Sequence, residues 1–461
     1  MNHVLDDTIV ALSTPSGVGA IAMIRLSGPQ AIRISDEIFL GKKLGDQKTH
    51  TIHFGKIIDN EQVIDEVLVS IFKGPRSYTG QDTTEISCHG SPYISEQIIK
   101  LCIKAGARTA NPGEFTMRAF LNGQIDLSQA EAVADLISSE TQAQHELAIN
   151  QMRGGYSDMI KSLRDKLIEF ASLLELENDF GEEDVEFADR SALVKLVTSI
   201  KTLIGELLQS FDYGNAIKEG IPVAIIGKPN VGKSTLLNKL LNEDRAIISA
   251  IPGTTRDIIE DTMQLDGILF RFIDTAGIRD TQDEIEQMGI AKTKEQIEKA
   301  QIILYIDEIK EDHNEITSDF KKHDLSNKKT IILLNKIDSF HKCHSYDVEE
   351  AVGTLTNRTP TIAISAKDGK HIEKLKSTLT QIITSSKSSS NIVVSNLRHH
   401  EALNNANQAL QKVLDGLNQN ISSDFLALDI RYALSSLGEI SGEVSTDDLL
   451  DSIFRNFCIG K

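Results

Sequence analysis

Apolar and polar positions follow different patterns in successive parts of the chain, and each pattern predicts a different kind of structure. Near the start, residues 8–14, 20–28 and 63–74 carry the short apolar runs of strands, whereas 29–39 has the apolar spacing of a helix. From residue 126 to 177 apolar residues recur every three or four positions. Mixed α/β structure is therefore predicted to give way to long amphipathic helices.

A third pattern begins at residue 218, where β-branched apolar runs alternate with helical segments to about residue 380. This alternation is typical of a parallel, doubly wound sheet. A serine-rich linker at 385–390 follows, and the helical spacing then resumes. The chain is predicted to be multidomain, with an N-terminal α/β domain at 1–120, an all-α helical domain at 121–217 and 381–461, and an α/β domain at 218–380 inserted into the helical one.

Composition limits where such a chain works and what it binds. Its formal net charge is −19, so nucleic acid contacts must be local or come from a basic partner. No apolar run is long enough to span a bilayer, and the start of the chain lacks the pattern of a signal peptide. Four cysteines without paired spacing indicate a reducing compartment. We therefore expect a cytoplasmic protein with no membrane partner.

One short cysteine- and histidine-containing stretch could suggest a metal site. The sequence "HKCH" at 341–344 is too tightly spaced for the usual zinc patterns, which favours a surface loop.

A phosphate-binding loop is the clearest chemical motif. The stretch "GKPNVGKS" at 227–234 matches G-x-x-x-x-G-K-[ST] between a predicted strand and a predicted helix. Backbone N–H groups of such a loop approach phosphates, Lys233 can reach the β and γ phosphates, and Ser234 can bind Mg²⁺.

The base is indicated by "NKID" at 335–338, which follows another predicted strand. The Asp338 carboxylate can accept two hydrogen bonds from guanine, whereas adenine offers no such pair. With "DTAG" at 274–277 and "SAK" at 365–367, four ordered elements predict a Ras-like P-loop GTPase domain. The predicted GTP contacts are Asn230, Val231, Gly232, Lys233, Ser234, Thr235, Ser249, Ala250, Ile251, Pro252, Gly253, Thr254, Asp274, Thr275, Ala276, Gly277, Asn335, Lys336, Asp338, Ser365, Ala366 and Lys367.

In Ras-like switches, the residue directly after "DTAG" is a glutamine that positions the water for GTP hydrolysis. Here that residue is Ile278, which cannot orient water, so we assign the role to Glu286 in the acidic run 283–289. A solvated helix start is the alternative reading of these acids. Thr255 is the candidate second Mg²⁺ ligand, and Asn230 offers an oxygen to a monovalent cation that would neutralise transition-state charge.

Together the motifs resemble a known family. "GKPNVGKST", "AIPGTTRD", "DTAGIRDTQDEIEQMGI", "NKID", the terminal "CIGK" and "NPGEFTMRAFLNGQIDLSQAEAV" at 111–133 are similar in order and spacing to the MnmE (TrmE) family of tRNA-modifying GTPases. The resemblance implies a GTPase that works with the flavoprotein MnmG to add an aminomethyl or carboxymethylaminomethyl group at C5 of wobble uridine in certain tRNAs. The carbon would come from a tetrahydrofolate derivative (formyl- or methylene-tetrahydrofolate), and FAD would reside on the partner.

The family also implies a homodimer, formed through the N-terminal domain, whose G domains approach each other across potassium. Carried onto this chain, Mg²⁺ would lie on Ser234 and Thr255, and catalysis of hydrolysis would fall to Glu286. The implied K⁺ ligands are Asn230, Ser249, Ile251 and Thr254. The implied folate contacts are Arg25, Glu85, Gln124 and Lys461, with arginine and lysine suiting the glutamate tail and Glu85 the pterin donors.

Several readings stay open. Gln124 stands where the family often has a basic residue, and Arg25 on its own would read as a surface arginine in a strand. Cys458 of "CIGK" is a candidate catalytic thiol or a residue that only lines a pocket, docked by the helical segment 445–457. "GVGAIA" at 17–22 imitates a dinucleotide fingerprint, but the sequence after it reads as strand rather than helix. The alternative function is a ribosome-assembly or regulatory GTPase, which the acidic charge disfavours.

Overall fold

The computed structural model describes residues 6–179, 190–244, 261–273, 295–309, 328–339, 359–384, 392–419, 421–455, 457 and 460. The chain divides into two compact units, each assembled from segments that lie far apart in the sequence. The first comprises Met1–Ser138, Ile149–Leu193 and Asp415–Lys461, and the second Ser139–Ala148 and Val194–Leu414. Because helical segments contribute to both units, the domain boundaries predicted near residues 120, 217 and 380 stay predictions.

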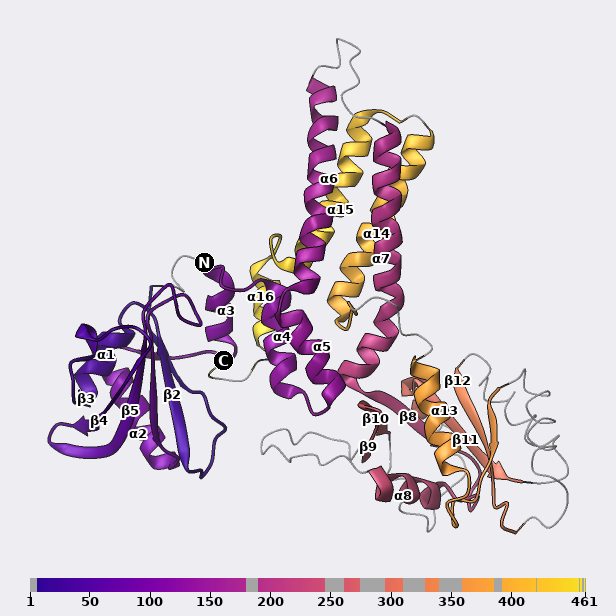
Figure 1. The fold of residues 1–461 in the computed structure, drawn as a ribbon, viewed down its shortest axis with the longest axis horizontal. Coiled ribbons are helices and arrows are strands. Elements are labelled where there is room, and N and C mark those ends of the chain that lie inside the picture. The colour runs from indigo at the N-terminus through magenta and orange to yellow at the C-terminus, as the bar shows by residue number, and fades with distance from the viewer. Residues whose placement is uncertain are drawn as a thin grey trace. The chain divides into compact units, whose positions relative to one another are not determined.

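A mixed seven-stranded sheet forms the N-terminal part of the first unit, in the order β3-β4-β5-β6-β2-β1-β7 (Figure 1). The strands are β1 (Ile9–Leu12), β2 (Ile21–Ser27), β3 (Phe39–Leu40), β4 (Thr51–Asp59), β5 (Gln62–Phe72), β6 (Thr83–His89) and β7 (Arg108–Thr109). All neighbours pair antiparallel except β1 and β7, which run parallel. The predicted mixed α/β character of this region is confirmed.

One face of this sheet is covered by α1 (Ala31–Ile38) and α2 (Pro92–Lys104). Alternate strand residues such as Ile24, Val69 and Ile86 point into that core, as the period of two in a strand requires. The opposite face carries the intervening residues. Near β1 it is covered by α3 (Glu114–Leu121), whose Phe115 packs on Ile9 and Ala11.

The rest of the first unit is helical, as its apolar spacing predicts. It contains α4 (Leu127–Ser138), α6 (Gly155–Asp179), α15 (Ser423–Ser441) and α16 (Asp447–Phe454), while α5 (Gln142–Met152) belongs to both units. Helices α6 and α15 lie side by side although more than two hundred residues separate them in sequence (Figure 1). Apolar residues of α16 pack with those of α4, among them Leu127, Leu450 and Phe454.

A six-stranded sheet forms the centre of the second unit, in the order β13-β12-β11-β8-β10-β9. Its strands are β8 (Ile221–Ile226), β9 (Asp261–Leu265), β10 (Ile268–Phe272), β11 (Ile302–Glu308), β12 (Lys329–Asn335) and β13 (Thr361–Ala363). The strands from β13 to β10 run parallel, which confirms the predicted doubly wound sheet.

The edge strand β9 departs from the prediction, because it runs antiparallel to β10. Asp266 and Gly267 turn the chain between them with φ of +48° and +79°. Positive φ at both central residues is the signature of a tight hairpin turn, and Asp-Gly is a preferred pair for it. The sequence therefore contained this signal, although the alternation of strands and helices suggested only parallel strands.

The helices of the second unit include α8 (Lys233–Asp244), α13 (Ile372–Thr384), and most of α7 (Arg190–Glu219) and α14 (Leu397–Asn418). Leu236 and Leu240 of α8 and Leu375 and Leu379 of α13 join one core with the apolar strands. The Lys201 ammonium of α7 donates to the Gln411 side chain of α14, so those two helices also lie side by side. Of the described helices, none is both long and apolar enough to cross a membrane.

Candidate functional site

The loop between β8 and α8 has a backbone that demands glycine at two positions. Gly227 and Gly232 have φ of +154° and +105°, and Asn230 has φ of +64°. A Cβ at Gly227 would lie 2.1 Å from the Ile306 carbonyl oxygen, and one at Gly232 would lie 2.3 Å from Nδ2 of Asn335. Because strand β11 and the Asn335 amide press against the loop, only glycine fits at these two positions.

Lys233 is held across the mouth of this loop. Its Nζ donates to the carbonyl oxygens of Gly227 and Lys228, at 2.8 and 2.7 Å. Burial lowers the pKa of Lys233 from its ordinary value. Ser234 follows it in the first turn of α8, where backbone N–H groups and a hydroxyl meet phosphate oxygens and Mg²⁺ in such loops.

Two further loops are hydrogen-bonded to the phosphate loop and to each other. Asn335 at the end of β12 is buried; its Nδ2 donates to the Val231 carbonyl at 2.7 Å, and its Oδ1 accepts from the Ala366 N–H at 3.0 Å. Ser365 Oγ donates to Oδ1 of Asp338 at 2.7 Å. The structure thus brings the predicted phosphate and base contacts into one connected frame.

The Asp338 carboxylate is ready to act as an acceptor. The hydrogen bond from Ser365 holds the pKa of Asp338 below its usual value, with smaller help from the Ser339 hydroxyl and Lys367. A carboxylate that is ionised at neutral pH and open to solvent can accept both N–H groups on the guanine edge.

Sequence reasoning missed one charged residue beside this frame. The Glu308 carboxylate forms an ion pair with the Lys336 ammonium, and Lys336 has a left-handed backbone with φ of +70°. Glu308 ends β11, and its register partner on β12 is Asn335. An acidic residue at the end of the strand next to "NKID" was the available signal, but only the sheet order reveals that the strands are neighbours.

The remaining predicted nucleotide and metal ligands lie outside the described residues, so their roles stay predictions. They are Ser249, Ala250, Ile251, Pro252, Gly253, Thr254, Thr255, Asp274, Thr275, Ala276, Gly277 and Glu286. "HKCH" at 341–344 also lies outside them. Within the ranges that the structure describes, no group of three or more histidine, cysteine, aspartate and glutamate side chains could hold a metal ion.

A second cluster lies on the open face of the N-terminal sheet. Arg25 and Glu85 are directly opposite on β2 and β6, and Nε and Nη2 of Arg25 both meet Oε1 of Glu85, at 2.9 and 2.8 Å. The rings of Tyr78 and Phe115 flank the guanidinium, with centroids 5.4 and 5.7 Å from its central carbon. The pair is largely shielded, with 14% and 18% of the two side chains exposed.

The family resemblance implies that Arg25 suits the glutamate tail of a folate and that Glu85 suits the pterin. Those two ligand groups stand at opposite ends of a folate, whereas the two side chains form one ion pair. A single end of a ligand would therefore meet both residues.

Two other predicted folate contacts, Gln124 and the chain end, are placed by their neighbours in the first unit. A Cβ at Gly80 would lie 3.2 Å from Nε2 of Gln124, which places that amide against the loop that carries Tyr78. At the other end of the chain, the Gly460 carbonyl accepts a hydrogen bond from Ser13 Oγ at 3.1 Å. Within the predicted helical segment 445–457, the helix α16 spans Asp447–Phe454 and packs on α4, and Phe457 packs near Phe454. Cys458 and Lys461 lie outside the described residues.

A buried ion network beneath this cluster was not predicted. Arg118 and Glu114 of α3 are both buried, and they pair with each other at 2.9 Å. Arg118 also pairs with Asp7, and Arg108 of β7 bridges Asp7 and Glu114 at 2.5 Å each. Burial alone would raise the pKa of Glu114, but hydrogen bonds from Arg108, the Asn111 N–H and Arg118 outweigh it, so the pKa is lowered.

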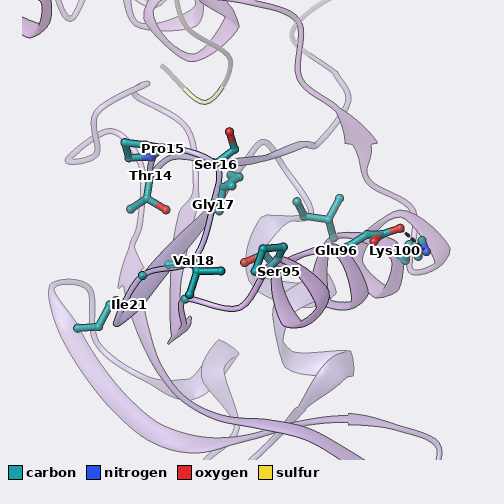
Figure 2. Close-up of a pocket in the computed structure, with 15 residues that line it drawn as sticks. Thr14, Pro15, Ser16, Gly17, Val18, Ile21, Ser95, Glu96 and Lys100 are labelled. Atoms are coloured by element: carbon teal, nitrogen blue, oxygen red, sulfur yellow. Dashed lines mark ion pairs between the residues drawn. The ribbon is translucent and has the colours of Figure 1, made fainter. Parts of the chain in front are cut away.

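The glycine-rich stretch at 17–22 lines a pocket on the other face of the sheet. Figure 2 shows Thr14 to Val18 on one side of this pocket and Ser95, Glu96 and Lys100 of α2 on the other. The pocket has a volume of about 700 Å³. Strand β2 rather than a helix follows the glycines, which confirms that the dinucleotide fingerprint lacks its structural context.

Comparison with known proteins extends these features to the whole chain. The family model for the MnmE helical domain matches residues 127–458, and the one for the GTP-binding protein TrmE N-terminus matches residues 8–124. The chain is 51% identical to the tRNA modification GTPase MnmE of Cytophaga hutchinsonii, over 100% of this chain and 98% of that protein. It is 52% identical to the protein of the same name from Flavobacterium johnsoniae, over 99% of both chains.

Some solved structures match part of the chain. Aquifex aeolicus Era bound to GDP and AlF4⁻ is 25% identical with a TM-score of 0.28, and it covers 41% of this chain and 66% of its own.

Proposed function

The chain belongs to the MnmE family of tRNA modification GTPases, and on that premise we propose that it helps to modify C5 of the wobble uridine in certain tRNAs. The group installed is an aminomethyl or carboxymethylaminomethyl group, and an MnmG-like flavoprotein is the partner that carries FAD. The observation that carries the proposal is the similarity to tRNA modification GTPases along the full chain, rather than over the nucleotide-binding part alone. The same full-length similarity argues against the alternative of a ribosome-assembly or regulatory GTPase.

The direct test is mass spectrometry of wobble uridine in tRNA from cells that lack this protein. We expect the C5 modification to disappear and to return when the gene is restored. A normal modification pattern in the deleted strain would contradict the proposed function.

GTP binding follows from the connected frame of Val231, Asn335 and Ala366. Lys233 would meet the β and γ phosphates, Ser234 and Thr255 would hold Mg²⁺, and Mg²⁺ would neutralise charge on the phosphates. Glu286 is proposed to orient the attacking water in place of the missing glutamine. Asn230, Ser249, Ile251 and Thr254 are proposed to hold K⁺, whose charge would stabilise the transition state.

The ion pair on the open sheet face supports a tetrahydrofolate site and suggests how it is divided. We propose that Arg25 and Glu85 both meet the pterin end, where Glu85 can accept from adjacent ring N–H groups. Lys461 follows Gly460, which lies beside the end of β1, and would meet the glutamate tail. Gln124 would contribute a neutral hydrogen bond where the family often has a cation.

The same sheet face supports the proposed homodimer. Phe54 of β4 and Leu68 of β5 are register partners, and they remain 65% and 45% exposed, with Ile52 beside them at 65%. Exposed apolar residues that are neighbours on one face mark an interaction surface, and a second copy of the chain would cover them.

Sedimentation of full-length variants tests this assignment. Phe54→Glu should shift the protein from dimer to monomer, because a charge would be buried in the interface. Phe425→Glu, at a helix position that is also 65% exposed, is the matched control and should leave the dimer intact. A dimeric Phe54→Glu variant would contradict the placement of the interface.

A further inference from the structure

Tyr78 lies against the ion pair but belongs to no site assigned so far. Its ring is 5.4 Å from the central carbon of the Arg25 guanidinium, and its hydroxyl lies 2.8 Å from Oγ1 of Thr116 on α3. The side chain is 37% exposed, whereas the other flanking ring, Phe115, is fully buried. Of the two rings, only Tyr78 can therefore touch a molecule that approaches the ion pair from solvent.

The loop that carries Tyr78 is fixed on both sides of it. Asn122 Nδ2 donates to the Thr79 carbonyl at 2.6 Å, and the Thr79 and Ser27 hydroxyls are 2.6 Å apart. Gln81 Oε1 accepts from Arg118 at 3.1 Å, which ties the loop to the buried ion network. A ring that is already ordered loses little conformational freedom when a ligand arrives, so its contact favours binding more strongly.

The polar groups beside the ring restrict what kind of ligand fits. Nε and Nη2 of Arg25 both meet Oε1 of Glu85. The other carboxylate oxygen, Oε2, has no hydrogen bond within the described part of the chain. A carboxylate oxygen accepts N–H groups, and an aromatic ring favours a flat partner. The ligand end that satisfies both is a planar nitrogen heterocycle with N–H groups along one edge.

We propose that Tyr78 is a ligand-contacting residue, against which the heterocycle lies while its N–H groups donate to Glu85. This inference rests on the proposed folate site and adds to it the residue that recognises the shape of the pterin end. The contact of Tyr78 with Thr116 then serves to set the ring angle.

Calorimetry of the full-length protein with 5-formyl-tetrahydrofolate tests the role of the ring. Tyr78→Ala should weaken ligand binding about tenfold. A tenfold change in Kd is ~1.4 kcal/mol, which is within the range that an aromatic contact contributes. Tyr78→Phe keeps the ring and should stay within about twofold of the parent. GTP turnover should be unchanged in both variants, because the nucleotide frame belongs to the other compact unit.

A fluorescence measurement separates contact from loop structure. The chain contains no tryptophan, so Tyr78→Trp introduces a single reporter at the proposed contact. The emission of this tryptophan should change with ligand concentration until it saturates, with the same Kd as in calorimetry. Tyr93 lies on α2 and is 63% exposed. The Tyr93→Trp control should show only a linear loss of emission, caused by absorption of light by the ligand.

The outcomes distinguish the two levels of the proposal. No binding heat with the parent chain would overturn the folate site and the role of Tyr78 together. Normal binding by the parent and equally tight binding by Tyr78→Ala would overturn the role of Tyr78 alone, as would a linear response from Tyr78→Trp.

Discussion

Gly232 shows how much of the nucleotide site depends on single atoms. Its φ is +105°, and an added Cβ would lie 2.3 Å from the Asn335 amide that joins the phosphate loop to the base loops. Gly232→Ala should therefore weaken GDP binding by roughly five- to 150-fold, since forcing such a backbone costs about 1–3 kcal/mol. Titration with a fluorescent GDP analogue measures the loss. Gly205→Ala, at a helical glycine with no atom near its added Cβ, is the control and should bind GDP normally.

Glu286 is the residue proposed to orient the water that attacks GTP. Glu286→Ala should bind GTP with near-normal affinity but lower kcat by about 100-fold or more, the usual contribution of a group that positions or deprotonates water. Single-turnover hydrolysis and nucleotide binding, measured on the same preparation, separate the two effects. Unchanged kcat would reassign the role and favour a solvated helix start for these acids.

Residues are predictable from sequence where their chemistry is local. Lys233 and Asp338 could be predicted because each belongs to a short motif that is recognisable in the sequence, "GKPNVGKS" and "NKID". Glu308 and Arg118 were missed because their partners come from other strands or from the start of the chain. The proposal that Arg25 and Glu85 meet the same end of a folate depends on the strand register, which places the two side chains directly opposite each other.

At the scale of elements, the buried ion network joins α3 to β7 and to the start of the chain. The folded pKa values of Glu114 and Asp7 lie below their ordinary values of 4.5 and 3.8. At low pH the unfolded chain therefore binds more protons than the folded chain. The stability that these ion pairs supply is present above pH 4.5 and is lost as the pH falls below it. We expect protection of α3 amides against hydrogen exchange to fall below that pH.

Variants of the pair make this prediction specific. Arg118→Met leaves the buried Glu114 without its helix partner and should destabilise this region by about 3–5 kcal/mol, whereas adding Glu114→Gln should recover part of the loss. The double variant should also show a weaker pH dependence of exchange in α3. Equal pH dependence in the parent and the double variant would contradict the assignment.

The observed helices and strands followed the apolar pattern closely, because a helix buries one face and a strand covered on both sides buries nearly every residue. Strands β8, β11 and β12 are buried along nearly their whole length, as continuous apolar runs predict. The antiparallel edge strand β9 was not anticipated, since the direction of a strand depends on its turn rather than on its apolar pattern. The sheet orders also required tertiary structure, because β1 lies between β2 and β7 although β7 is far along the chain.

At the scale of the whole molecule, the proposed K⁺ site predicts that GTP hydrolysis depends on which monovalent cation is present. Replacing K⁺ by Na⁺ at constant ionic strength should lower GTP turnover about tenfold or more, because a smaller cation does not fit the same oxygen ligands and leaves transition-state charge unbalanced. Steady-state phosphate release measures the effect, and nucleotide affinity should change little. Equal turnover in both salts would remove the cation from the mechanism.

Variants at the chain end test whether tRNA modification with folate and GTP hydrolysis use separate sites of this protein. Gly460 has φ of +95°, and an added Cβ would lie 2.2 Å from the Leu12 carbonyl oxygen, so Gly460→Val should displace the tail that Ser13 holds. We expect folate affinity and tRNA modification to fall about tenfold or more, since Lys461 would lose its place, while GTP turnover stays normal. Cys458→Ser keeps the docked tail and should abolish modification only if the thiol takes part in the chemistry. Gly45→Ala, where an added Cβ meets no atom, is the control for the first variant. Normal folate binding by Gly460→Val would show that the tail is not part of the ligand site.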